Sequence, residues 1–214
     1  MTKEQALSHA YSLEGWFEPE DMDVIWDIVL ENASQQKKVV EVGSWKGRSS
    51  YVMAAACQTV GAKLLCIDSF KGLLLGEEHI NWSLYHGSGG YYSEGNNGSV
   101  LPTFLTVMQE FIPQTVTPVE ADSRQAHQDI SDYSCDVVFI DGDHDEPVIG
   151  MDLRNYVSKV RPGGIYCGDD YEPGNNVSRS LQAFIKEYNS TREVDKQLVL
   201  EPTKSTLWKI RIPE

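Results

Sequence analysis

The sequence predicts an α/β fold in which helices cover both faces of a mostly parallel sheet. Short apolar runs rich in β-branched residues alternate with segments whose apolar residues recur at helical spacing. This alternation is typical of a doubly wound sheet with parallel neighbouring strands. Near the carboxyl end, two strand-like runs are separated by only a few residues, so they must pair as an antiparallel hairpin. We therefore expect seven strands, mostly parallel, with a carboxyl-terminal hairpin.

Two helices are expected ahead of the first strand, over residues 3–13 and 21–35. The second follows the acidic residues Glu20 and Asp21, which suit the first turn of a helix. Its apolar residues then recur at helical spacing: Val24, Ile25, Ile28 and Val29. Residues 1–36 are thus expected to form amino-terminal helices that pack on the rest of the fold.

A β-α-β unit follows these helices. The run at 37–43 is β-branched and ends in glycine, 48–60 returns to helical spacing, and 62–68 is again strand-like. Further strands are expected at 115–122, 136–141 and 163–170, with helices at 147–160 and 177–189. The hairpin strands are expected at 196–202 and 205–212.

Length and composition predict a single domain over residues 1–214, because a chain of this size with 41% apolar residues can bury one good core. The stretch 69–101 has no regular pattern and is rich in glycine and aromatic residues. Loops of this length are uncommon unless they are functional, so we expect a lid or substrate-binding insertion. Its candidate pocket-lining side chains are His79, Trp82, Tyr85, His86, Tyr91 and Tyr92.

Composition excludes several function classes. The chain carries 32 acidic and 18 basic residues, and a formal charge of −14 opposes binding to a nucleic-acid backbone. No apolar run approaches a membrane span, and the first residues lack the pattern of a secretory signal, so we expect a cytoplasmic protein. The four cysteines form no CxxC pair, which argues against a zinc knuckle or a disulfide framework.

A glycine-containing turn at 41–50 joins a strand to a helix. Gly43 and Gly47 allow the backbone to pass close to a ligand at a helix amino terminus. The closely spaced glycines of a dinucleotide site are missing, because residue 45 is tryptophan. Glu41 at the mouth of the turn would repel a pyrophosphate and attract an ammonium or sulfonium group. The turn therefore favours a cationic ligand.

The ends of the next two strands carry polar residues suited to a nucleoside. Asp68 ends the strand at 62–68, where a carboxylate can accept both ribose hydroxyls. Asp122 ends the strand at 115–122 and Ser123 comes next; both are candidates for hydrogen bonds to an adenine edge.

Carboxylates also end two later strands. Asp141 ends the strand at 136–141, and Asp169 and Asp170 end the strand at 163–170. Unpaired acids in one crevice would raise each other's pKa, and a divalent cation would resolve this repulsion. Oxygen ligands without thiolate suit Mg²⁺, Mn²⁺ or Ca²⁺. These three aspartates are therefore candidate metal ligands.

With these motifs, the chain resembles the class I S-adenosylmethionine-dependent methyltransferases, which implies a Rossmann-like fold and S-adenosylmethionine as cofactor. The segments "FIDGDH" and "RPGGIYCGDDY" are similar to the metal-dependent small-molecule O-methyltransferases of the catechol, caffeoyl and macrolide-sugar types. The cofactor-binding residues that this resemblance implies are Glu41, Gly43, Ser44, Gly47, Ser49, Asp68, Ser69, Ala121, Asp122, Ser123 and Asp141. Lys46 and Arg48, beside the glycine turn, are candidates for contact with the methionine carboxylate.

The resemblance also implies that the metal chelates two adjacent hydroxyls of a small-molecule acceptor, and that the protein is a homo-oligomer such as a dimer. Catechol-type relatives carry a lysine three residues beyond the first metal aspartate, where this chain has His144. An imidazole suits proton transfer near neutral pH, so His144 is the candidate catalytic base beside Asp141. Two alternatives remain for His144: it orients a carboxylate, or it donates to the substrate. Asp143 and Asp145 either support the metal ligands or only open the following helix.

Other functions remain open at this point. A metal-independent N- or O-methyltransferase of the same fold would use the acids directly as bases. A nicotinamide-dependent oxidoreductase is disfavoured by Trp45 and Glu41 in the glycine turn. A cofactor-binding scaffold without catalysis would leave the three aspartates unexplained.

Overall fold

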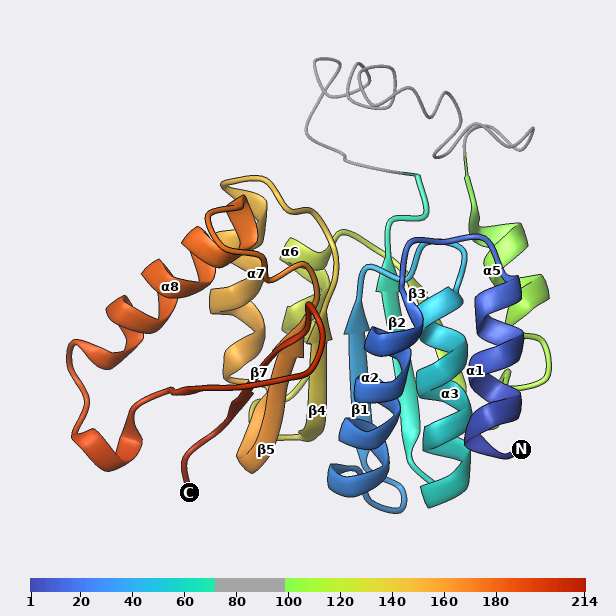
Figure 1. Ribbon diagram of the computed structural model, residues 1–214, viewed down its shortest axis with the longest axis horizontal. Helices are drawn as coiled ribbons and strands as arrows, with labels where there is room; N and C mark the ends of the chain where they lie inside the picture. Colours follow the sequence, from blue (N-terminus) through green and yellow to red (C-terminus); the bar gives the residue numbers. More distant parts are fainter. Residues whose placement is uncertain (72–98) are drawn as a thin grey trace.

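A seven-stranded sheet runs through the centre of the computed structural model, which describes residues 1–71 and 99–214 (Figure 1). The strand order is β3-β2-β1-β4-β5-β7-β6. The strands are β1 (Lys38–Val42), β2 (Lys63–Asp68), β3 (Val116–Glu120), β4 (Cys135–Ile140), β5 (Val160–Gly168), β6 (Leu200–Glu201) and β7 (Trp208–Arg211). Strands β1 to β5 are parallel, and β7 pairs antiparallel with both β5 and β6. The predicted sheet and its terminal hairpin are confirmed.

Helices cover both faces of this sheet (Figure 1). The described helices are α1 (Lys3–Ser12), α2 (Pro19–Asn32), α3 (Arg48–Val60), α5 (Leu101–Val107), α6 (Ser123–Ala126), α7 (Val148–Val157) and α8 (Asn176–Asn189). Helices α1, α2, α3 and α5 pack against one face, and α6, α7 and α8 against the other. Alternate strand residues supply the two cores: Val137 belongs to the first and Val138 to the second. The predicted doubly wound arrangement is confirmed.

Local sequence explains how several helices begin. Helix α1 starts at a capping box in which the Thr2 side chain accepts from the Gln5 N–H and the Gln5 side chain accepts from the Thr2 N–H. Helix α2 has Pro19 in its first turn, and Asn175 caps α8 by accepting from the Ser178 N–H.

The region expected to be irregular is only partly described. Helix α5 begins at Leu101, and residues 72–98 lie outside the described residues. The predicted lid and its candidate pocket residues (His79, Trp82, Tyr85, His86, Tyr91 and Tyr92) fall in that range. None of the helices in the described part is long and apolar enough to cross a membrane. All four cysteines are free and buried.

The strand order reverses between β1 and β4, which is the position where sheets of this kind bind ligands. The chain leaves β1 toward β2 on one side and later returns to β4 on the other, so connections diverge at the carboxyl ends of these two strands. At that point the Asp141 N–H donates to the Val42 carbonyl at 2.8 Å, and the Gly43 N–H donates to the Ile67 carbonyl at 2.9 Å. The turn after β1 therefore lies directly against the residue that follows β4.

Candidate active site

Two glycines give the turn after β1 its shape. Gly43 has φ +90° and Gly47 has φ +96°, conformations that L side chains rarely adopt. A Cβ at residue 43 would lie 2.0 Å from the backbone oxygen of Asp141, so only glycine permits this close approach. Gly47 is the N-cap of α3, whose first N–H groups face the turn. The predicted ligand-binding turn thus abuts the predicted metal ligand Asp141.

Asp68 holds this turn in place. Its Oδ2 accepts the backbone N–H of Ser44 at 2.9 Å and of Trp45 at 2.8 Å, and its Oδ1 accepts the Phe70 N–H at 2.6 Å. Burial raises the Asp68 pKa above its ordinary value, although the three N–H donors favour the ionised form. The carboxylate therefore links the glycine turn to the end of β2. Its contact with a ribose stays a prediction.

Glu41 lies beneath the turn instead of at its mouth, which corrects our expectation. The residue is fully buried, and its Oε1 accepts the Ser49 hydroxyl at 2.7 Å while its Oε2 accepts the Ser44 hydroxyl at 2.7 Å. The Ser50 hydroxyl also donates to Oε2. Burial raises the Glu41 pKa to about 7. The hydrogen bonds from the three serine hydroxyls lower the pKa, and the charge of Asp141 raises it. Glu41 supports the turn from below, and a direct contact with the cofactor stays a prediction.

The buried Glu41 predicts a pH-dependent stability. Because its folded-state pKa of about 7 exceeds the ordinary 4.5, its contribution is fully present below pH 4.5 and is lost as pH rises through 7. The loss amounts to about 3 kcal/mol. Glu41→Gln keeps the side-chain size and removes this titration, so its free energy of unfolding is expected to fall less steeply than that of the wild type. Urea denaturation at successive pH values measures both slopes; equal slopes would contradict the assignment.

The candidate adenine-side residues adjoin Asp68. The Ala121 N–H donates to the Asp68 backbone carbonyl at 2.9 Å. Asp122 caps α6 by accepting from the Arg124 N–H, and its ion pair with the Arg124 guanidinium lowers its pKa. The Ser123 carbonyl accepts the hydroxyl of Tyr156 at 2.9 Å. The structure thus places the expected ribose and adenine residues side by side at the ends of β2 and β3.

Lys46 and Arg48 both contact the amino-terminal part of the chain, and their contacts with a methionine carboxylate stay a prediction. Lys46 is buried and forms an ion pair with Glu14 at 2.8 Å. The Arg48 guanidinium donates to the backbone carbonyls of Leu13 and Phe17. Both cations therefore attach the connection between α1 and α2 to the glycine turn, a role that local sequence does not reveal.

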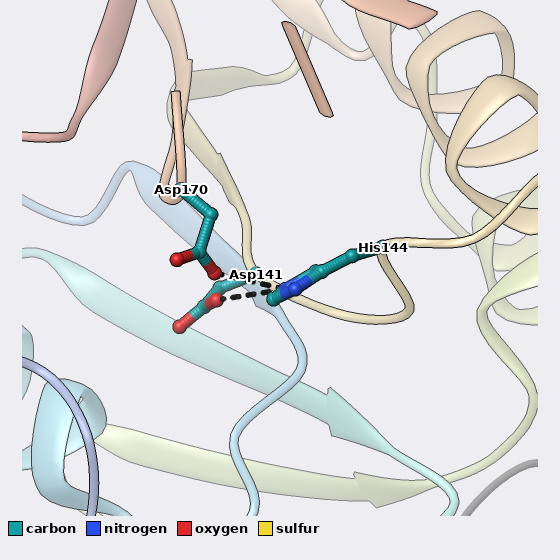
Figure 2. Close-up of side chains that lie close together, drawn as sticks. All are labelled: Asp141, His144 and Asp170. Carbon is teal, nitrogen blue, oxygen red and sulfur yellow. Dashed lines mark ion pairs between the residues drawn. The ribbon is translucent and has the colours of Figure 1, made fainter. Parts of the chain in front are cut away.

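Asp141, His144 and Asp170 meet where β4 and β5 end (Figure 2). His144 Nε2 lies 3.2 Å from Asp170 Oδ2 and 3.6 Å from Asp141 Oδ1. One ligand atom from each of the three side chains lies within 4.8 Å of the others. The side chains are 21%, 41% and 46% exposed for Asp141, His144 and Asp170, so a ligand can reach them from solvent.

Electrostatic strain marks this cluster. Burial and the charge of Asp170 raise the Asp141 pKa to about 6. Burial and the charges of Asp141 and Asp170 raise the Asp169 pKa to about 8. Burial lowers the His144 pKa, but the hydrogen bond to Asp141 and the nearby acidic charges outweigh it and raise the value to about 9. The site therefore concentrates more negative charge than its own residues neutralise.

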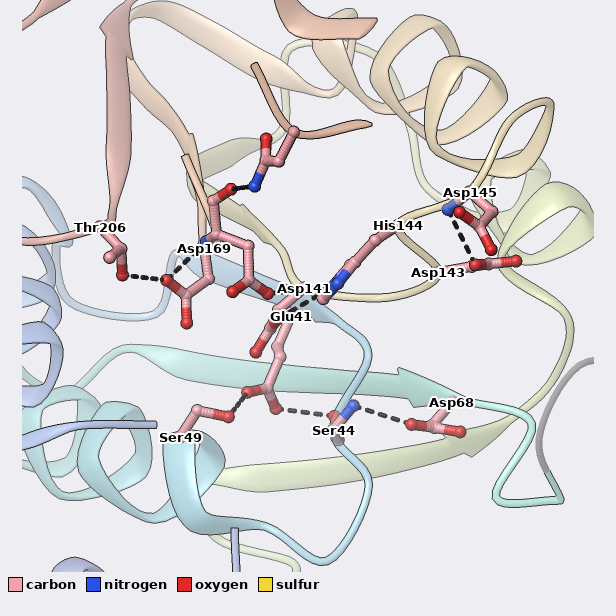
Figure 3. A network of polar contacts seen from close by, with 12 residues as sticks. Glu41, Ser44, Ser49, Asp68, Asp141, Asp143, His144, Asp145, Asp169 and Thr206 are labelled. Carbon is pink, nitrogen blue, oxygen red and sulfur yellow. Dashed lines mark hydrogen bonds and ion pairs between the residues drawn. The ribbon is translucent and has the colours of Figure 1, made fainter. Parts of the chain in front are cut away.

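Asp169 is close to the cluster but makes a separate set of contacts (Figure 3). Its Oδ1 accepts the Asp170 N–H at 2.7 Å and lies 2.8 Å from the Thr206 hydroxyl. Gly168 just before it permits β5 to approach β4, because a Cβ there would lie 2.3 Å from the Ile140 carbonyl oxygen. Of the three predicted metal ligands, the structure brings Asp141 and Asp170 together with His144 and places Asp169 beside them.

The donor set fits a hard divalent cation. The carboxylate oxygens of Asp141 and Asp170, with no thiolate beside them, suit Mg²⁺, Mn²⁺ or Ca²⁺ better than zinc in a cysteine site. A bound cation would also offset the negative charge that these acids concentrate.

Sequence reasoning missed two residues near this site and left two others undecided. Asp21 on α2 and Thr206 between β6 and β7 contact each other, and Thr206 contacts Asp169. Asp143 Oδ1 accepts the Asp145 N–H at 3.0 Å, and Asp145 accepts from the Asn176 side chain at 2.5 Å. Asp145 therefore helps to form the start of α7 and its contact with α8.

Comparison with known proteins agrees with this geometry. A family model described as a methyltransferase domain matches residues 40–171, which is well over half of the chain. No curated protein matches the sequence significantly.

Solved structures share the whole architecture. The O-methyltransferase NovP aligns with a TM-score of 0.65 at 15% identity, covering 94% of this chain and 84% of NovP. The S-adenosylhomocysteine-bound methyltransferase PaMTH1 of Podospora anserina aligns with a TM-score of 0.64 at 10% identity, covering 99% of this chain and 88% of PaMTH1. At such identities these likenesses show a common fold. Together with the family match and the glycine turn, they establish that the chain belongs to the methyltransferase-domain family and is a class I S-adenosylmethionine-dependent methyltransferase.

Proposed function

We propose that the protein is a divalent-metal-dependent O-methyltransferase that methylates one of two adjacent hydroxyls of a small molecule. The observation that carries this proposal is the group of Asp141, His144 and Asp170 at the ends of β4 and β5. This group lies against the glycine turn, since Asp141 contacts Gly43 through the backbone. A methyl acceptor held at these acids would therefore lie next to the glycine turn, where the cofactor would bind. The relatives' O-methyltransferase names support the same reaction class.

Asp141, Asp169 and Asp170 are the residues that would hold the cation. When bound, such a cation supplies Lewis acidity, which favours the deprotonated form of a coordinated hydroxyl. The carboxylates of Asp141 and Asp170 come from neighbouring strands, so the sheet itself fixes their separation. A rigid site of this kind favours the in-line approach of a hydroxyl to a sulfonium methyl group.

His144 is the candidate proton acceptor. Its Nε2 faces both acids, and 41% of its side chain is exposed to the solvent from which an acceptor arrives. The charges of the two acids raise the pKa of this imidazole, so neutralising them returns it toward the ordinary range of histidine. A free imidazole then accepts the hydroxyl proton at Nε2 near neutral pH.

A chelator experiment tests this function. Protein treated with EDTA is expected to lose methyl transfer to vicinal diols and catechols and to regain it with Mg²⁺ or Mn²⁺. Analogues in which one of the two hydroxyls is already a methyl ether serve as matched acceptors and are expected to react poorly, because they offer only one ionisable oxygen. Transfer that is unchanged in EDTA, measured with radiolabelled S-adenosylmethionine, would overturn metal dependence.

A second candidate is a metal-independent N- or O-methyltransferase of the same fold. The ion pairs of His144 with Asp141 and Asp170 favour it, since they form a ready acid–base group without a cation. In that case activity would persist in EDTA and fall with His144→Asn. The family assignment removes the nicotinamide-dependent oxidoreductase that the sequence left open.

A further inference from the structure

Three segments far apart in the sequence meet at the Asp169 side chain. Asp169 follows β5, Thr206 lies between β6 and β7, and Asp21 lies in the first turn of α2. The Thr206 Oγ1 is 2.8 Å from Asp169 Oδ1 and 2.9 Å from Asp21 Oδ1 (Figure 3 shows the contact with Asp169). Asp21 is only 5% exposed, and Thr206 and Asp169 are half-buried, so the Asp21 end of these contacts is screened from water.

The hydrogen bonds divide naturally between the two acids. Thr206 offers two donors, a backbone N–H and a hydroxyl with one hydrogen. The N–H lies 3.1 Å from Asp21 Oδ1, which gives Asp21 a donor without the hydroxyl. The hydroxyl hydrogen is therefore available to Asp169. Asp21 therefore holds Thr206 in place, and the Thr206 hydroxyl orients Asp169.

Further contacts make this arrangement rigid. The Thr206 carbonyl accepts the Tyr171 N–H at 2.8 Å, which ties the connection before β7 to the segment after β5. Asp169 Oδ1 also accepts the Asp170 N–H at 2.7 Å. Two donors on one carboxylate oxygen restrict rotation of the group. The second oxygen therefore has a defined direction relative to the neighbouring acids.

We infer that Thr206, anchored by Asp21, is a positioning residue that orients Asp169 for binding the cation of the proposed function, on which this inference rests. Groups that hydrogen-bond metal ligands set the direction of the ligand lone pairs, and their loss typically weakens metal binding by about tenfold to a hundredfold. The amino-terminal helix α2 and the carboxyl-terminal hairpin thereby both contribute to a site whose ligands come from β4 and β5.

The test is calorimetric titration of Mn²⁺ into the full-length protein with S-adenosylhomocysteine present. Thr206→Val keeps the side-chain shape and the backbone N–H to Asp21 but removes the hydroxyl. We expect its Mn²⁺ dissociation constant to rise by about tenfold or more. Thr206→Ser restores the hydroxyl and is expected to bind Mn²⁺ nearly as well as the wild type.

Ser205→Ala is the matched control in the same connection. The Ser205 hydroxyl accepts the Leu207 N–H at 3.2 Å, so its loss perturbs the loop without removing the Thr206 hydroxyl. Mn²⁺ binding by Ser205→Ala should match the wild type.

Two results would overturn the inference. One is wild-type Mn²⁺ affinity in Thr206→Val. The other is a loss of Mn²⁺ binding in this variant that only parallels a loss of S-adenosylhomocysteine binding or a lower unfolding midpoint. A wild-type protein that binds S-adenosylhomocysteine but no Mn²⁺ would instead refute the metal dependence of the proposed function, and this inference with it.

Discussion

Replacing Asp141 with asparagine is expected to reduce methyl transfer by about a thousandfold while leaving binding of S-adenosylhomocysteine largely intact. Asp141 supplies charge where β4 ends and approaches both His144 and the glycine turn. Loss of a metal-binding carboxylate removes several kcal/mol of charge stabilisation in the transition state. The cofactor turn itself is built by Gly43 and Asp68, which the substitution does not alter.

Single-turnover rates and calorimetric cofactor titration together separate these effects. Glu172→Gln is the matched control, since it neutralises an exposed acid two residues beyond Asp170. This control should keep wild-type activity. An Asp141→Asn enzyme that retains a tenth or more of wild-type turnover would show that Asp141 does not carry the reaction.

Gly43→Ala is expected to lower the free energy of unfolding by about 3 to 5 kcal/mol and to abolish cofactor binding. The new Cβ would lie 2.0 Å from the oxygen and 2.4 Å from the carbonyl carbon of Asp141, both backbone atoms that cannot rotate away. The positive φ adds conformational strain. Both effects displace the glycine turn from the end of β4.

Gly174→Ala separates strain from crowding. Gly174 has φ +82°, close to that of Gly43, but nothing lies within 4 Å of a Cβ there. The Gly174→Ala variant should lose about 1 to 2 kcal/mol of unfolding free energy, because only the backbone strain at positive φ contributes. Urea denaturation and S-adenosylhomocysteine titration of both variants measure the difference. Equal losses would contradict the close approach of Gly43 and Asp141.

Much of the fold was predictable because its signals are local. The alternation of apolar runs and helical spacing located β1, α3 and β2, and the short connection before β7 required a hairpin. Helix α5 was not anticipated, because it follows a long glycine-rich stretch that hides its start. The four-residue helix α6 was too short to give a periodic signal.

The position of the candidate residues was predictable where they lie at strand ends and not where packing decides it. Asp68, Asp141 and Asp170 follow strands whose parallel order dictates a common edge. The burial of Glu41 depends on three serine hydroxyls that turn inward, two of them on α3. Thr206 touches Asp21 across 185 residues, a distance at which no sequence pattern indicates contact.

The contacts that the two cations beside the glycine turn make within the chain could not be predicted either. Lys46 and Arg48 were predicted to meet a ligand because of their position in the chain. The structure pairs them with Glu14 and with carbonyls of the amino-terminal connection. The partner of a charged side chain depends on which segment packs over it, and this packing is not encoded in the neighbouring sequence.

The proposed function requires that the carboxylates at the ends of β4 and β5 bind a divalent cation. Anomalous diffraction from crystals grown with Mn²⁺ and S-adenosylhomocysteine tests it most directly. The expected result is one strong anomalous peak within coordinating distance of Asp141 and Asp170, with Asp169 completing the protein ligands. Ordered S-adenosylhomocysteine at the glycine turn with no anomalous peak between these aspartates would contradict it.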